Sequence, residues 1–159
     1  MLVFNHHGHL IPNTNIKSNL LEFQVEFVDK INTPRRYELF AKYNHYSSSL
    51  KAVLNELPLL QWIDGSFVTK KAAPGDIDLV TFIDDRSVNL LGGAIEQFKY
   101  PFSMEIYGVD AYLVKTYRRE DKKYPLYIGD SMYWMNSFDK TQSGRNGKKL
   151  PKGFLEIIY

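Results

Sequence analysis

Two short apolar segments at residues 59–63 and 77–83, joined by a polar connection, constrain this chain more than any other feature. Each has the length and the boundaries of a buried strand. Asp76 and Asp78 stand one residue apart where the second segment begins. Because alternate residues of a strand point to the same face, both carboxylates can aim at one point in space. The pattern therefore predicts a strand–connection–strand unit with an acidic pair at the start of its second strand.

Such an acidic pair favours a metal ion. Two nearby carboxylates repel each other unless one is protonated or a cation lies between them. Hard oxygen ligands suit Mg²⁺ or a similar divalent ion. The connection itself begins with Gly65 and Ser66. The glycine lets the backbone approach a ligand closely, and a serine at the start of an expected helix can hold phosphate oxygens. A phosphate-binding turn beside a metal-binding acidic pair is typical of enzymes that transfer phosphoryl or nucleotidyl groups.

A third acid is expected on a later strand. The segment 109–116 alternates so that Asp110 shares one face with Tyr112, in otherwise apolar surroundings. A carboxylate there is costly unless it is paired or bound to a metal. Glu105 is the alternative, although it precedes Gly108 and is expected on another strand.

The spacing resembles the nucleotidyltransferase superfamily of the DNA polymerase β type. The resemblance rests on Gly65-Ser66, then Asp76-Ile77-Asp78 after nine intervening residues, with an acid on a later strand. It covers about residues 35–116. The fuller string looks closest to small, poorly characterised bacterial members and to minimal nucleotidyltransferases, some of which are paired with toxins or used in phage defence.

The resemblance implies an enzyme that binds NTP with two Mg²⁺ ions, or Mn²⁺ in their place. Asp76 and Asp78 would hold both ions, Asp110 would complete the catalytic metal site, and Gly65 and Ser66 would hold phosphates. The acceptor hydroxyl could belong to a protein, a tRNA end or another nucleotide, and a partner toxin is a further expectation.

One position departs from the family pattern. Many members carry an arginine shortly after the Gly-Ser pair, where this chain has Phe67 and Val68, and the nearest cations are Lys70 and Lys71. This departure keeps a second function class open. The chain could be a catalytically weak binding module, antitoxin-like or nucleotide-sensing, because a fold alone does not establish activity.

A basic, glycine-rich segment at 142–153 could supply the phosphate contacts instead. It contains Arg145, Lys148 and Lys152 and could fold over a triphosphate, or it could be a solvated surface loop. Near the amino terminus, His6, His7 and His9 cluster, either as a metal site or as part of a hairpin turn; without an evident carboxylate partner, the turn is favoured.

The composition fits a single globular domain of 159 residues, with 44% hydrophobic and 24% charged residues. The absence of cysteine excludes disulfides and thiolate chemistry. We expect a cytoplasmic protein without a membrane segment or signal peptide. A net charge of +2 does not by itself demand a nucleic-acid partner.

The expected fold is α+β, a nucleotidyltransferase-like mixed β-sheet with helices packed on it. A hairpin and a helix over 1–33 would extend a core formed by 34–159. The expected elements are a hairpin at 2–11, helices at 18–30, 34–57, after Ser66 and at 84–98, and a helix or turn region at 124–135. Strands are expected at 59–63, 77–83 and 154–159, with one or two more within 102–117.

Overall fold

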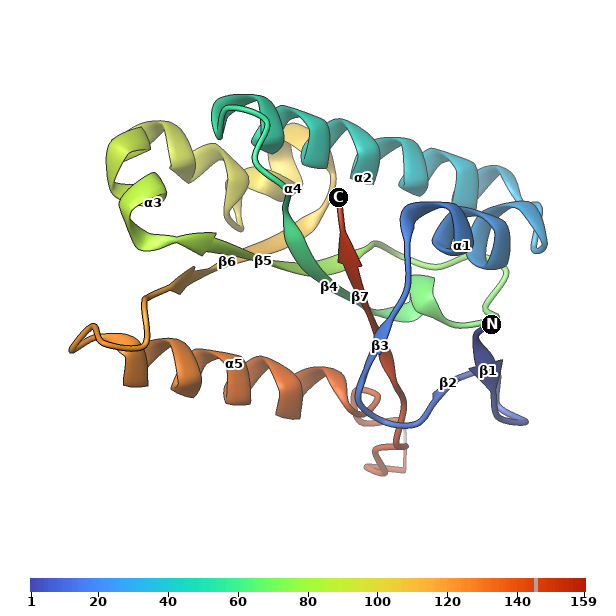
Figure 1. Ribbon diagram of the computed structural model, residues 1–159. Helices are drawn as coiled ribbons and strands as arrows, with labels where there is room; N and C mark the ends of the chain where they lie inside the picture. Colours follow the sequence, from blue (N-terminus) through green and yellow to red (C-terminus); the bar gives the residue numbers. More distant parts are fainter. Residues whose placement is uncertain (145) are drawn as a thin grey trace.

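The computed structural model describes residues 1–144 and 146–159, and its centre is a mixed five-stranded sheet (Figure 1). The strand order is β3-β7-β4-β5-β6. β4 runs antiparallel to both β5 and β7, whereas β5 pairs in parallel with β6 and β3 with β7. The strands are β3 (Asn15–Lys17), β4 (Leu60–Asp64), β5 (Asp78–Asp84), β6 (Asp110–Thr116) and β7 (Phe154–Ile158).

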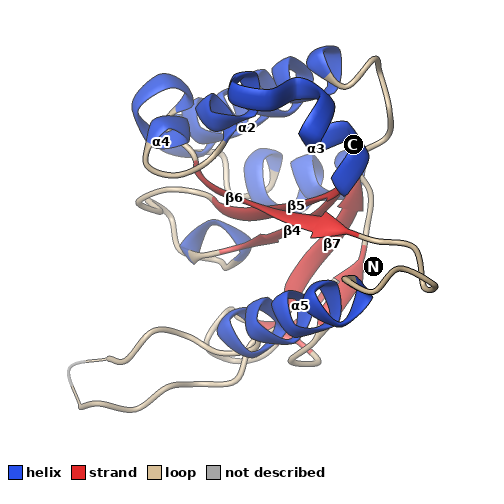
Figure 2. Cartoon of the chain, turned by 90° about the vertical axis from the view of Figure 1, so that its left-hand side faces the viewer, coloured by secondary structure: helices blue, strands red, loops and turns tan. Residues whose placement is uncertain are grey.

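Helices cover both faces of this sheet, so the chain is an α+β protein with three layers. The long helix α2 lies on one side together with α3 and α4, and α5 lies on the other side (Figure 2). The helices are α1 (Leu20–Gln24), continued by the π-helical turn η1 (Val25–Asp29), α2 (Pro34–Val53), α3 (Asp85–Leu91), continued by the 3-10 segment η3 (Gly92–Phe98), α4 (Phe102–Tyr107) and α5 (Tyr124–Phe138).

The alternation of the strands divides the apolar side chains into two cores. On β4, Ile63 faces the larger core under α2, whereas Trp62 faces the smaller core under α5. On β5, Leu79 and Val80 divide in the same way. Since the side chains of a strand alternate, every second residue near the strand ends faces α5.

The amino-terminal part shares the larger core. The hairpin β1 (Val3–Phe4) and β2 (Leu10–Ile11) contributes Leu10, and the first helix contributes Phe23. Both side chains are fully buried, and the Phe23 ring packs edge-on against Tyr43 of α2 at a centroid distance of 5.4 Å.

Most expected elements are confirmed, one is wrong, and one alternative is excluded. The helix expected after Ser66 is only the 3-10 turn η2 (Ser66–Val68), because the chain is extended again at Thr69 and its carbonyls are bound by a side chain from α2. Of the one or two strands expected within 102–117, only β6 is present, and the first part of this stretch is the helix α4. It follows Pro101 and ends at Gly108 in the left-handed conformation, a common helix stop.

Two further points complete the fold. The short strand β3 was not expected, since a three-residue strand carries little periodicity. Within the described ranges, no helix combines the length and the apolar character needed to cross a membrane.

Candidate functional site

Three aspartates stand in register across the middle strands. Asp64 at the end of β4 pairs with Asp78 at the start of β5, and Asp78 pairs with Asp110 at the start of β6. Each lies two residues from a side chain of the α5-side core, so all three carboxylates face α5. The geometry of the sheet therefore forms a row of acids at one edge.

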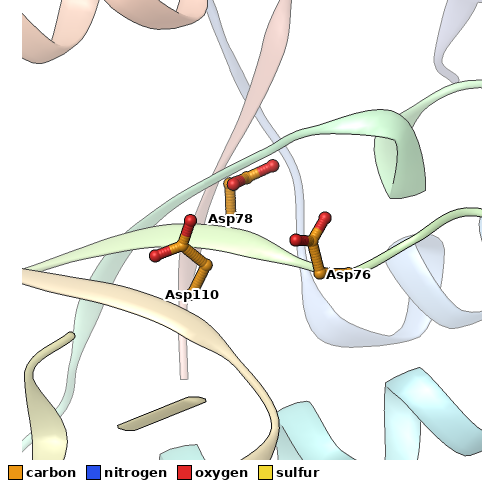
Figure 3. Close-up of side chains that lie close together, drawn as sticks. All are labelled: Asp76, Asp78 and Asp110. Carbon is orange, nitrogen blue, oxygen red and sulfur yellow. The ribbon is translucent and has the colours of Figure 1, made fainter. Parts of the chain in front are cut away.

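Asp76 joins this row from the segment that leads into β5. Ligand oxygens of Asp76, Asp78 and Asp110 all lie within 4.8 Å of one another, and the three side chains converge (Figure 3). The structure thus brings together the three carboxylates that the sequence predicted. Glu105, the alternative third acid, lies on α4 and is not part of this group.

The neighbouring acids destabilise one another's charged forms. Burial raises the pKa of the Asp78 carboxyl to about 8, with further contributions from the charges of Asp76, Asp64 and Asp110. The Oδ1 atom of Asp110 is buried and has no hydrogen-bond partner among the described residues. A buried, unpaired carboxylate oxygen beside two further carboxylates is the arrangement that a divalent cation would relieve. The donor set therefore fits a hard metal ion such as Mg²⁺.

Gly65 makes room for the central carboxylate. Its φ is +83°, and a Cβ atom built there would lie 1.9 Å from Oδ2 of Asp78. Only glycine is compatible with both the backbone conformation and the close approach. The Ser66 hydroxyl accepts a hydrogen bond from the N–H of Gly75 at 3.3 Å, which ties both ends of the connection together directly before Asp76.

Two arginines of α2 hold the connection between β4 and β5. The fully buried Arg36 guanidinium donates to the carbonyls of Phe67, Thr69 and Lys71 over distances of 2.6–3.0 Å. Arg35 donates to the carbonyl of Pro74 at 3.2 Å. Burial lowers the pKa of Arg36 to about 10. Sequence reasoning missed both residues, because charged side chains in the first turn of a helix are usually solvated.

Asp64 was also missed, and it engages one of the predicted cations. Its carboxylate contacts the ammonium group of Lys152, and both side chains are buried. Burial raises the pKa of Asp64 to about 6 even with this partner. Lys152 is fixed by its backbone, since its N–H donates to the carbonyl of Asp139 at 2.9 Å. Lys152, which was predicted to bind phosphate, thus lies at the site but is paired with an acid.

The other predicted cations differ in their placement. Lys70 lies at the site, where its ammonium is 3.5 Å from a Glu26 carboxylate oxygen and 3.9 Å from the centre of the Phe4 ring. Lys148 is exposed and does not line the site cavity. Arg145 lies outside the described residues.

The aspartates line a cavity of about 1130 Å³, which has two chemically different walls. One wall is polar and comes from the β1–β2 hairpin and the connection after Gly65; its members are His6, His7, His9, Lys70 and Lys71. The other wall is aromatic and comes from β6 and α5; its members are Tyr112, Tyr133, Trp134 and Phe138. The hairpin turn predicted for the histidines is confirmed, but the sequence did not indicate that the turn borders the acids.

The structure thus defines an α+β protein with a carboxylate site at the edge of a mixed sheet, beside a large cavity. The chain belongs to DUF6932, described as a family of unknown function, whose model matches residues 2–158. No curated protein and no solved structure matches the chain.

Proposed function

We propose that the chain is a Mg²⁺-dependent nucleotidyltransferase that transfers a nucleotidyl group from NTP to an acceptor hydroxyl. The observation that carries the proposal is the convergence of Asp76, Asp78 and Asp110 next to Gly65 at the rim of one cavity. The motif spacing adds the resemblance to the DNA polymerase β type. Mn²⁺ would serve in place of Mg²⁺, because both prefer oxygen ligands.

The two walls of the cavity support a nucleotide as the ligand. Aromatic side chains can stack on any of the nucleic-acid bases. Tyr112 and Trp134, whose ring centres lie 4.7 Å apart, provide an aromatic surface of this kind. The polar wall carries lysines and imidazoles, which suit phosphate groups. The acids line the same cavity as both walls. One nucleotide could therefore place its base on the aromatic wall and its phosphates on the polar wall.

The residues take separate roles in this reaction. Asp76 and Asp78 would hold two ions and Asp110 would complete one of the sites; the bound ions would supply charge neutralisation for the phosphates. Asp110, with its unpaired Oδ1, would accept the proton of the acceptor hydroxyl. The acceptor oxygen then forms a bond to the α-phosphorus, the bond to the β-phosphate oxygen breaks, and pyrophosphate leaves. Gly65 and Ser66 fix the connection that carries Asp76.

The acceptor class follows only from the resemblance. We propose a hydroxyl of a protein, a tRNA end or a nucleotide, with a toxin as one such protein partner. The cytoplasm supplies both NTP and Mg²⁺, and we place the activity there.

Pyrophosphate release tests the activity without knowledge of the acceptor. The protein is incubated with each NTP and Mg²⁺ or Mn²⁺, with RNA or protein fractions as acceptors, and α-labelled product is followed in parallel. We expect metal-dependent release that Asp110→Asn abolishes and Glu105→Gln leaves unchanged, since Glu105 lies outside the carboxylate group. Release that is equal in wild type and Asp110→Asn would refute the assigned role.

One observation favours a second candidate, a nucleotide-binding module with little activity. Two of the predicted cations that line the cavity are already engaged, Lys70 with Glu26 and Lys152 with Asp64. Phe67 and Val68 occupy the family's arginine position and are fully buried. NTP and Mg²⁺ binding without label transfer, in the presence of every acceptor fraction, would favour this module.

A further inference from the structure

We infer that the tip of the β1–β2 hairpin binds the terminal phosphates of the nucleotide. His6, His7 and His9 would form this anion subsite with Lys71, opposite the carboxylates. The inference rests on the proposed function because it assigns a further part of the same ligand. The hairpin lies outside the segment 35–116 that resembles the superfamily.

The hairpin is joined directly to the connection that follows Gly65 and Ser66. The backbone N–H of Lys70 donates to the carbonyl of Gly8 at 3.0 Å, and His9 forms a β-bridge with Thr69. A Cβ atom at Gly8 would lie 2.9 Å from the Cβ of Lys70, so the approach is close. The tip therefore lies beside the segment that carries the acids.

Hydrogen bonds within the hairpin stabilise its tip without a ligand. The Asn5 side-chain oxygen accepts hydrogen bonds from the backbone N–H groups of His7 and His9 at 2.9 and 3.1 Å. The N–H of Asn5 donates to the carbonyl of His9 at 2.9 Å. The ring centres of His6 and His7 lie 3.8 Å apart. A preorganised tip loses less conformational freedom on binding.

The three histidines border the cavity, where His6 and His7 are exposed and His9 is half-buried. All three histidines line the cavity, and no side-chain hydrogen bond of theirs is found within residues 1–144 and 146–159. The Nδ1 atom of His9 is buried and unpartnered among those residues. A buried polar atom without a partner calls for an explanation, and a ligand in the cavity that His9 lines would provide one.

The surroundings favour an anion over a metal. Burial, followed by the positive charge of Lys152, lowers the pKa of His9. The histidines do not form a metal-ligating group in the described part of the chain, where the three aspartates do. An imidazole donates at least one N–H, and lysines add charge, so phosphate oxygens fit this wall. The hairpin thus supplies the contacts for which the family pattern uses an arginine.

The experiment compares inorganic triphosphate, ATP and adenosine as ligands in the presence of Mg²⁺. Isothermal titration is carried out on wild type, on the double variant His6→Gln/His7→Gln, and on His9→Asn. His45→Gln on α2 is the matched control, because His45 does not line the cavity. Melting temperatures establish that each variant is folded.

We expect the double variant to bind triphosphate and ATP at least about tenfold more weakly, with adenosine and Mn²⁺ affinities unchanged. Unchanged triphosphate affinity in both histidine variants would overturn the inference, as would an equal loss for adenosine. Failure of the proposed function gives a different result: wild type would bind triphosphate without α-label transfer, and Asp76→Asn would retain its Mn²⁺ affinity.

Discussion

Replacing Asp78 by asparagine should stabilise the metal-free protein while it abolishes metal binding. The pKa of Asp78 is raised from 3.8 to about 8 by burial and by neighbouring carboxylates. A folded-state pKa above the ordinary value means that the carboxyl favours folding only while protonated. The contribution of the carboxyl to the unfolding free energy is therefore fully present below about pH 4 and is lost as the pH rises through about 8.

The magnitude follows from the same shift. With about 1.36 kcal/mol per pH unit, a pKa moved from 3.8 to about 8 bounds the cost of the charged group at pH 7 at about 4 kcal/mol. Partial protonation of the other acids and relaxation of the site reduce this value, so we expect a gain of about 1–2 kcal/mol. Asparagine keeps the shape beside Gly65 and removes the charge.

Urea unfolding in EDTA at pH 5 and pH 8 measures the effect. The unfolding free energy of Asp78→Asn should be higher than that of wild type at pH 8. At pH 5 the difference should be smaller. Asp130→Asn, an exposed acid on α5, is the control and should match wild type. Adding Mn²⁺ should stabilise wild type but not Asp78→Asn, because only a ligand that binds the folded state raises stability. An Asp78→Asn protein that is less stable than wild type at pH 8 would refute the reasoning.

Three further predictions concern residues around the acids. Arg36→Met should lower the unfolding free energy by about 3 kcal/mol or more in urea unfolding, because several buried carbonyls lose their donor; a loss below about 1 kcal/mol would contradict this role. Lys152→Met should cost about 3–5 kcal/mol at pH 8, since it leaves the Asp64 carboxylate buried and unpaired. Adding Asp64→Asn should restore most of that loss, and a double variant as unstable as the single one would argue against the pair. Trp134→Ala should weaken ATP binding by about 1–3 kcal/mol in titration calorimetry while inorganic triphosphate binds as before; equal losses for both ligands would indicate a general distortion.

The central acids could be predicted because strand alternation is a local property. Asp76 and Asp78 lie in one short segment, and Asp110 interrupts an apolar pattern, so each carries its own indication in the sequence. The register between strands is set by contacts that are distant along the chain. Asp64 therefore became recognisable only when its pairing with Asp78 was seen.

The contacts of Arg36 and of the β1–β2 hairpin could not be predicted from periodicity. Arg36 looks like any charged residue near a helix start, yet it is fully buried and binds carbonyls about thirty residues away. Its binding of those carbonyls also explains why the expected helix after Ser66 is a single 3-10 turn. Likewise, the turn at Gly8 was predictable, whereas its bond to Lys70 was not.

The most direct measurement of the central claim is anomalous diffraction from crystals soaked with Mn²⁺ and a non-hydrolysable NTP analogue. The account predicts Mn²⁺ peaks bound by Asp76, Asp78 and Asp110, with metal–oxygen distances of about 2.1 Å. It also predicts that the phosphates of the analogue are directed toward these ions. Well-ordered analogue density elsewhere, or Mn²⁺ peaks that leave all three carboxylates unbound, would contradict it.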